Sequence, residues 1–189
     1  MDYRTLGRSG CAVSVLALGT MTFGVETEEA EAHRQLDRFV EAGGTMVDTA
    51  NTYGAGRSEE IIGRWFASRP AEVTGRVVLA TKGRFPLDEA PNGAGLSARH
   101  LTRALDASLR RLGLEGVDLY QAHAFDPWTP LEETLRTLDG LVRAGTISHS
   151  ISRTSRLYCG CNVTGPAMFM ARARCTALVS CQPVKFDSP

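Results

Sequence analysis

The 189-residue sequence has no long apolar run and no excess of charge of either sign. No stretch approaches the ~18 consecutive apolar residues of a membrane-spanning helix, and residues 1–10 lack the apolar core of a secretory signal. Lys and Arg together number 21, as do Asp and Glu, so no overall field attracts nucleic acid or an anionic membrane. We therefore expect a cytoplasmic protein with neither kind of partner.

Cysteine is scarce over most of the chain. Cys11 is the only one before residue 159, and the other four are closely spaced near the end: Cys159, Cys161, Cys175 and Cys181. This distribution does not fit a disulfide framework. The C-x-C pair also lacks a companion His or a second pair at a zinc spacing, so we expect no metal site.

Short β-branched runs alternate with longer helical patterns. Strands are predicted to start near residues 15, 45, 77, 117 and 146, and spacings of about 30 to 40 residues are typical of βα units in a parallel sheet. The first strand is followed by "LGTMTFG" instead of G-x-G-x-x-G, which argues against an open dinucleotide-binding sheet. The pattern favours an α/β fold of the parallel (β/α)8 TIM-barrel type. Such barrels need about 250 residues, so we expect an incomplete barrel of five to six βα units.

The helical segments carry start signals and apolar stripes. The predicted N-caps are Thr27, Ser58, Ser97 and Thr129. The stripes expected to face the core are Leu101, Leu105, Leu109 and Leu112 in one helix, and Leu131, Leu135, Leu138 and Val142 in another. The basic pair Arg110 and Arg111 is interpreted as a solvated helix face.

Four titratable residues occupy equivalent places at the strand ends. Asp48 ends the second predicted strand, Lys82 the third and His123 the fourth, while Tyr53 lies in the Gly-rich loop after the second. The carboxyl ends of barrel strands form one mouth, so we expect these groups to converge there. Each residue alone would more often be an ordinary loop or core residue. Their occurrence together favours a site.

This combination suits proton donation. A Tyr phenol, with a pKa of about 10, donates poorly near neutrality, and a neighbouring ammonium lowers such a pKa. Asp48 would keep Lys82 charged and oriented, and His123 would donate a hydrogen bond to a substrate oxygen. The predicted chemistry is general-acid assistance to a carbonyl that is being reduced.

Four segments resemble the aldo-keto reductase family over residues 1 to about 149. They are "VDTANTYGAGRSEEIIGRW", "VVLATK", "SLRRLGLEGVDLYQAH" and "TPLEETLRTLDGLVRAG". The resemblance implies a (β/α)8 barrel, NADPH bound without a Rossmann motif, and reduction of an aldehyde or ketone. It also implies a catalytic tetrad, with Tyr53 as the general acid beside Asp48, Lys82 and His123.

The resemblance further implies which residues line the cofactor. They are Gly19, Thr20 and Met21 after the first strand, Asp48, and Gln182 from a possible sixth strand near residues 177–183. The sequence does not identify the carbonyl substrate.

After Gly145 the sequence departs from the family, and we divide the chain into a barrel part, residues 1–149, and a divergent or frameshifted tail, residues 150–189. The family's Ser-Asn pair, which holds the nicotinamide carboxamide, is missing, and from Ser150 onward the only acidic residue is Asp187. Codons for "RTSRLYCG" read one base out of frame can encode Ser-Asn-Phe-Thr-Ala-Leu-Leu-Trp. That favours a frameshift, with natural divergence as the alternative.

Three interpretations remain open. The chain is a reductase by descent that binds NADPH weakly and has little activity, an inactive partial barrel that self-associates through exposed sheet edges, or a product with no selected role. NADPH titration separates the first interpretation from the others, and the oligomeric state separates the second from the third.

Overall fold

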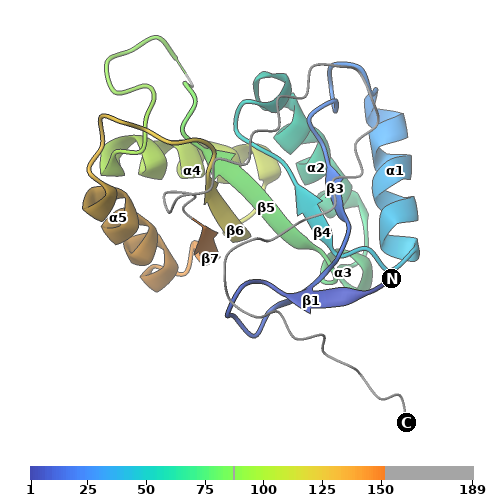
Figure 1. Ribbon diagram of the computed structural model, residues 1–189. Coiled ribbons are helices and arrows are strands. Elements are labelled where there is room, and N and C mark those ends of the chain that lie inside the picture. Colours follow the sequence, from blue (N-terminus) through green and yellow to red (C-terminus); the bar gives the residue numbers. More distant parts are fainter. Residues whose placement is uncertain (87, 152–189) are drawn as a thin grey trace.

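A five-stranded parallel sheet forms the centre of the molecule (Figure 1). The computed structural model describes residues 1–86 and 88–151. The strands lie in chain order: β3 (Ala17–Gly19), β4 (Met46–Asp48), β5 (Val78–Gly83), β6 (Val117–Ala122) and β7 (Ile147–Ile151). Every pairing between neighbours is parallel, which confirms the predicted strand order.

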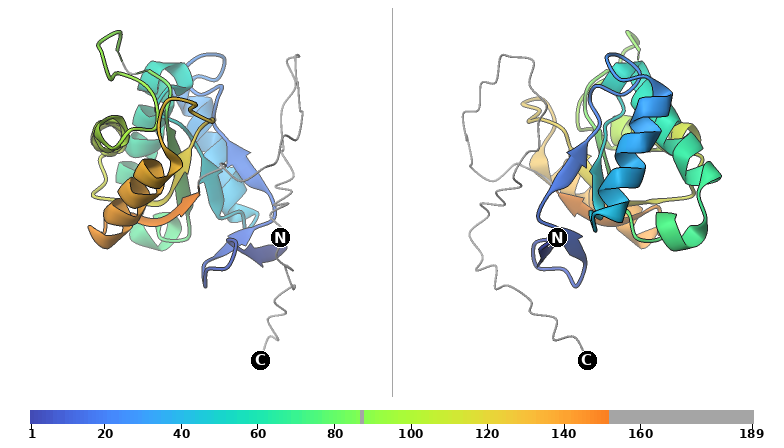
Figure 2. Two further views of the ribbon diagram at one scale, coloured as in Figure 1. Left: turned by 60° about the vertical axis from the view of Figure 1, so that its left-hand side comes forward. Right: turned by 90° about the vertical axis from the view of Figure 1, so that its right-hand side faces the viewer.

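Helices alternate with these strands and cover the outer side of the curved sheet (Figures 1 and 2). They are α1 (Glu29–Glu41), α2 (Arg57–Ser68), the short α3 (Ala71–Thr74), α4 (Ala98–Leu112) and α5 (Leu131–Arg143). Parallel strands joined by helices on one side are the repeating unit of the (β/α)8 barrel. The described part is therefore an α/β fold that corresponds to a partial TIM barrel. None of its helices is both long and apolar enough to cross a membrane.

The main core lies between the helices and the sheet. Trp65 on α2 is fully buried there with Leu36 of α1 and Leu105 of α4. The indole Nε1 donates to Asp37 Oδ1 at 2.8 Å, so this large side chain is buried without leaving its polar atom unpaired. Arg69 also pairs with Asp37 at 2.7 Å. Hydrogen bonding from Arg69 holds the pKa of the Asp37 carboxyl below its ordinary value, against the opposing effect of burial.

An N-terminal hairpin was not predicted from the sequence. Strands β1 (Tyr3–Thr5) and β2 (Ala12–Ser14) pair antiparallel and lie near the end of the sheet where the parallel strands begin (Figure 1). The hairpin is anchored by Tyr3, whose hydroxyl donates to the Gly43 carbonyl at 2.8 Å, and by reciprocal bonds between Ser14 and Thr45. The first parallel strand, predicted to start near residue 15, begins instead at Ala17, because Ala12–Ser14 belongs to β2.

One of the four predicted N-caps is confirmed. Ser97 Oγ accepts a hydrogen bond from the His100 amide at the start of α4. Helices α1, α2 and α5 instead have Glu28, Gly56 and Pro130 at the cap position, without a side-chain cap bond. The hydroxyls of Thr27, Ser58 and Thr129 bond elsewhere, to Thr22, Thr20 and Asp126 respectively.

The two predicted apolar stripes differ in burial. On α4, Leu101, Leu105 and Leu112 are buried and Leu109 is partly buried against the same core. On α5, Leu138 is buried, but the other three members are exposed within the described part: Leu131 at 38%, Leu135 at 47% and Val142 at 36%. The prediction of a buried stripe is therefore wrong for most of α5.

Arg111 also differs from its prediction as a solvated residue. Its guanidinium lies 2.7 Å from the Glu59 carboxylate, which is fully buried on α2, and Glu59 also accepts a hydrogen bond from the Thr81 hydroxyl. The pair connects α2 to both α4 and β5. Arg110 next to it is exposed, as expected.

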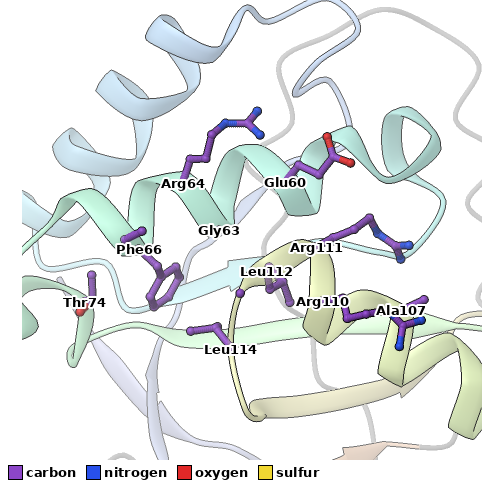
Figure 3. A pocket seen from close by; sticks show the side chains of 12 residues that line it. Glu60, Gly63, Arg64, Phe66, Thr74, Ala107, Arg110, Arg111, Leu112 and Leu114 are labelled. Carbon is purple, nitrogen blue, oxygen red and sulfur yellow. The ribbon is translucent and has the colours of Figure 1, made fainter.

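A groove of about 720 Å³ lies on the helical side, between α2 and the end of α4 (Figure 3). Its lining includes Gly63, Arg64 and Phe66 of α2 together with Arg110 and Leu112 of α4. None of the residues of the predicted tetrad lines it. This hollow is therefore separate from the site expected at the strand ends.

Some predictions concern residues outside the described part. They include the sixth strand near residues 177–183, Gln182, the last four cysteines and nearly all of the tail, residues 150–189. The division of the chain into a barrel part and a tail stays a prediction.

Candidate active site

The sheet register brings Asp48 and Lys82 close together. Asp48 is the last residue of β4 and pairs with Ala80 of β5, two residues before Lys82. Residues two apart on a strand project from the same face, so both side chains emerge from the same side at the carboxyl end of the sheet. Lys82 Nζ lies 2.7 Å from Asp48 Oδ2.

The Lys82 ammonium uses all three of its protons. Besides Asp48, Nζ donates to the Thr49 carbonyl at 2.9 Å and to the Tyr53 hydroxyl at 3.0 Å. The side chain is only 12% exposed, and a buried ammonium needs such partners to remain charged. The cation therefore lies directly against the phenol that the sequence predicts as the acid.

A tight turn places Tyr53. The residue begins a 3₁₀ turn, η1 (Tyr53–Gly56), and its amide donates to the Ala50 carbonyl at 3.1 Å. Gly54 and Gly56 have φ angles of 58° and 94°, in the left-handed region that glycine adopts at little cost. The "YGAG" sequence thus reverses the chain between β4 and α2 and leaves the phenol at the sheet end.

His123 completes the group directly after β6. Its ring contacts Tyr53 edge-on, with centroids 5.8 Å apart, and Phe85 at 4.7 Å. Burial, and then the Lys82 charge, lower the pKa of His123 to about 4, although Asp48 acts in the opposite direction. The imidazole is therefore neutral near pH 7 and presents one N–H donor and one lone pair. A neutral imidazole leaves Tyr53 as the better proton donor.

A hollow of about 340 Å³ opens over this group. It is lined by Asp48, Lys82, Gln121, Ala122 and His123. Although the groove on the helical side is larger, only this smaller hollow combines titratable side chains with the carboxyl ends of the strands. We therefore place the candidate active site here.

Sequence reasoning missed Gln121. Its side-chain Nε2 donates to Asp48 Oδ1 at 2.8 Å. A signal was present in the sequence, because Gln121 lies two residues before His123 and so faces the same side of β6. A polar side chain at that position of a buried strand is expected to have a hydrogen-bond partner.

The predicted cofactor-lining residues of β3 and its loop differ in surroundings. Thr20 is buried, its hydroxyl donates to the Asp48 carbonyl at 3.1 Å and accepts from Ser58, so its side chain is engaged within the protein. A Cβ placed on Gly19 would meet no atom within 4 Å, and Met21 is 65% exposed. The space beside Gly19 and Met21 is therefore open. Among residues 1–86 and 88–151, no three His, Cys, Asp or Glu side chains form a cluster that could hold a metal ion.

Comparison with known proteins identifies the family of this chain. The model of the aldo/keto reductase family matches residues 15–154, which include all four residues of the predicted tetrad. The chain belongs to the aldo/keto reductase family. The convergence of Asp48, Lys82 and Tyr53 agrees with the resemblance drawn from the sequence, while the catalytic roles of the tetrad stay predictions.

Three curated relatives illustrate the range of this similarity. An uncharacterized oxidoreductase of Bacillus subtilis is 41% identical over 157 residues, covering 79% of this chain and 48% of the relative. A probable voltage-gated potassium channel subunit beta of rice, Oryza sativa, is 37% identical over 146 residues (77% and 44%). The L-glyceraldehyde 3-phosphate reductase of Escherichia coli is 32% identical over 169 residues (88% and 46%). The chain spans about half the length of these relatives.

Proposed function

We propose that this chain carries the proton-donating site of an NADPH-dependent reductase that converts an aldehyde or ketone to an alcohol. The observation that supports this best is the Lys82 ammonium, held between the Asp48 carboxylate at 2.7 Å and the Tyr53 hydroxyl at 3.0 Å. Family membership supports the same reaction class. An aldehyde is the first substrate class to test, since one relative is named a reductase of L-glyceraldehyde 3-phosphate.

The residues present leave room for the cofactor. Gly19 has open space beside it and pairs in register with Asp48, which lines the hollow. Gly19, Met21 and Asp48 would contact bound NADPH, while Thr20 would support the loop through its bond to the Asp48 carbonyl. NADPH would supply the hydride that reduces the substrate carbon.

The side chains of the site would then act on the substrate oxygen. Tyr53 donates its proton as negative charge develops on that oxygen, and Lys82 stabilises the phenolate that forms. Asp48 compensates the Lys82 charge, and the neutral His123 orients the oxygen through its N–H. The arrangement stabilises a developing oxyanion more than it does a neutral carbonyl, as catalysis requires.

The chain as written is expected to bind NADPH weakly. The Ser-Asn pair of the family is replaced after Gly145, and a misplacement of the nicotinamide by about 1 Å can cost on the order of a hundredfold in rate. Fluorescence titration with NADPH, together with turnover of 4-nitrobenzaldehyde, tests this expectation. Micromolar binding with ready turnover would contradict it.

The assignment of the acid is tested by Tyr53→Phe. This variant removes the hydroxyl that contacts Lys82 and should abolish whatever NADPH-dependent turnover the chain shows. Tyr3→Phe is the matched control, because Tyr3 lies in the N-terminal hairpin and its hydroxyl bonds the Gly43 carbonyl. Measurable turnover that is equal in Tyr53→Phe and Tyr3→Phe would refute the proposed role of Tyr53. The expected cytoplasmic location also stays a prediction.

A second candidate function is association with another chain. Within the described part, β3 and β7 are each paired on one side only, and unpaired strand edges readily bind further strands. The exposed Leu131, Leu135 and Val142 of α5 add apolar surface. One relative is named a probable channel subunit. Sedimentation at several concentrations tests self-association, and a monomer at every concentration would contradict it.

A further inference from the structure

Among the described residues that line the 340 Å³ hollow, Gln121 is the polar one that does not belong to the predicted tetrad. It is the register partner of Lys82 across the β5–β6 pair, so the two side chains project from the same face of the sheet. From there Gln121 reaches past β5 and bonds to Asp48 on β4. The contact joins residues 73 positions apart in the chain.

The Asp48 carboxylate is held at both oxygens. Oδ2 accepts from Lys82 at 2.7 Å, and Oδ1 accepts from the Gln121 amide at 2.8 Å. An ionised carboxylate only accepts hydrogen bonds, so Gln121 must present its NH₂ group to Asp48. The torsion that rotates a carboxylate is soft, and a second partner on a different strand fixes it.

The orientation of Asp48 matters because each of the three protons of the Lys82 ammonium is already donated to a different acceptor. Its three acceptors are Asp48, the Thr49 carbonyl and the Tyr53 hydroxyl. The Thr49 carbonyl is fixed by the backbone. Asp48 is therefore the acceptor whose rotation could draw the ammonium away from Tyr53, and Gln121 opposes that rotation.

We propose that Gln121 is a positioning residue for the acid: by holding Asp48, it keeps the Lys82 ammonium against the Tyr53 hydroxyl. This inference rests on the proposed function, in which Tyr53 is the proton donor. It adds Gln121, on β6, to the hydrogen-bonded group formed by Asp48, Lys82 and Tyr53. Gln121 itself does not need to touch the substrate.

The lysine content of the chain allows a test that does not depend on turnover. Lys82 and Lys185 are the only two lysines in the sequence. In a Lys185→Arg background labelled with ¹⁵N-lysine, the single side-chain NH₃⁺ signal belongs to Lys82. Its proton exchange with water reports how firmly the ammonium is hydrogen-bonded.

The informative variant is Gln121→Met, which keeps the side-chain length and removes both amide protons. We expect exchange of the Lys82 protons to accelerate about threefold to tenfold, the equivalent of one hydrogen bond. Gln121→Leu serves as a second variant if the first unfolds. Gln35→Met, on α1 and remote from the hollow, is the matched control and should leave the Lys82 signal unchanged.

The outcomes separate this inference from the proposed function. Unchanged Lys82 exchange in Gln121→Met, or no slowly exchanging signal in the unaltered chain, overturns the positioning role whatever the turnover. If exchange accelerates but no form of the chain reduces an aldehyde, the result supports the role of Gln121 in positioning Lys82 and contradicts the proposed function. If turnover is present, Gln121→Met should lower kcat about threefold to tenfold with little change in KM.

Discussion

Replacement of Gly63 by Ala is predicted to lower the stability of the fold, whereas the same replacement at Gly140 is predicted to raise it. Gly63 lies inside α2, where the helix passes the last turn of α4 (Figure 3). A Cβ at this position would stand 2.6 Å from the Leu112 carbonyl oxygen and 2.7 Å from that of Arg111. Both obstacles are backbone atoms, which cannot rotate away as a side chain can. Gly63→Ala therefore requires the two helices to separate.

The geometry determines the size of the effect. Ordinary contact begins near 3.4 Å, so the shortfall at Leu112 is 3.4 − 2.6 = 0.8 Å. Overpacking of this kind costs about 1–3 kcal/mol, while replacing Gly by Ala within a helix gains about 1 kcal/mol. Gly140 in α5 is the matched site, since it is exposed and a Cβ there would meet nothing within 4 Å. Gly140→Ala should gain the helix propensity without the clash.

Urea unfolding followed by circular dichroism measures both variants. The propensity gain cancels between them, so Gly63→Ala should be less stable than Gly140→Ala by the packing cost of about 1–3 kcal/mol. With an m-value of about 2 kcal/mol per M, the midpoints should differ by about 0.5–1.5 M. Equal stabilisation by the two substitutions would refute the close approach of α2 to α4.

Two further predictions concern buried charge. Glu59→Gln leaves Arg111 without its counter-charge and should destabilise the fold by about 3 kcal/mol. Its control, Glu60→Gln at the exposed neighbouring position, should change stability by less than about 0.5 kcal/mol. Urea unfolding of the two variants measures the difference. His123 has a folded-state pKa of about 4 against 6.5 as its ordinary value, so the unfolded chain binds the extra proton between these values and stability falls as pH drops through that window. The full loss is about 3.4 kcal/mol, from about 2.5 pKa units at about 1.36 kcal/mol each. The difference between unfolding curves at pH 7.5 and pH 5 should therefore shrink in His123→Gln, and the remainder includes His100, whose pKa burial also lowers. An undiminished pH dependence in that variant would contradict the burial of a neutral imidazole.

Sequence reasoning succeeded where local pattern and topology agree. The spacing of the β-branched runs predicted five parallel strands in chain order, which the structure shows. Once that order is given, polar residues at strand ends must meet at one edge. Asp48, Tyr53 and Lys82 could therefore be brought together without knowledge of any distance.

The helix starts could not be predicted as well, because capping residues have competing partners. Ser58 has the composition of an N-cap, but the fold brings Thr20 within reach, and its hydroxyl bonds there. Thr129 likewise donates to Asp126. Ser97 meets no such competitor and caps α4 as predicted. An N-cap hydroxyl accepts from a helix amide, whereas Ser58 and Thr129 are oriented so that they donate to other partners, and in these orientations they cap no helix.

The exposed stripe on α5 has a related cause. The apolar spacing of Leu131, Leu135 and Val142 shows only that these residues share a helix face, whereas their burial depends on what that face packs against. In the described part, α5 packs on α4 and β7, and this leaves the three side chains at least 36% exposed. Periodicity therefore identified the helix correctly and its degree of burial incorrectly.

The position of the site within the sheet allows the hydrogen bonding of the Lys82 ammonium to be measured separately from NADPH binding. Asp48 and Lys82 lie on β4 and β5, and His123 comes directly after β6, so each of these strands has a neighbour on both sides, with β3 and β7 at the flanks. Interior strands open less readily than edge strands, and the acid group depends on contacts among these strands. Gln182, the predicted nicotinamide contact, lies outside the described part. A firmly held Lys82 ammonium together with weak NADPH binding would thus be consistent. The ammonium signal tests the contacts among β4, β5 and β6, whereas the NADPH titration also tests the predicted loss of the Ser-Asn pair after Gly145.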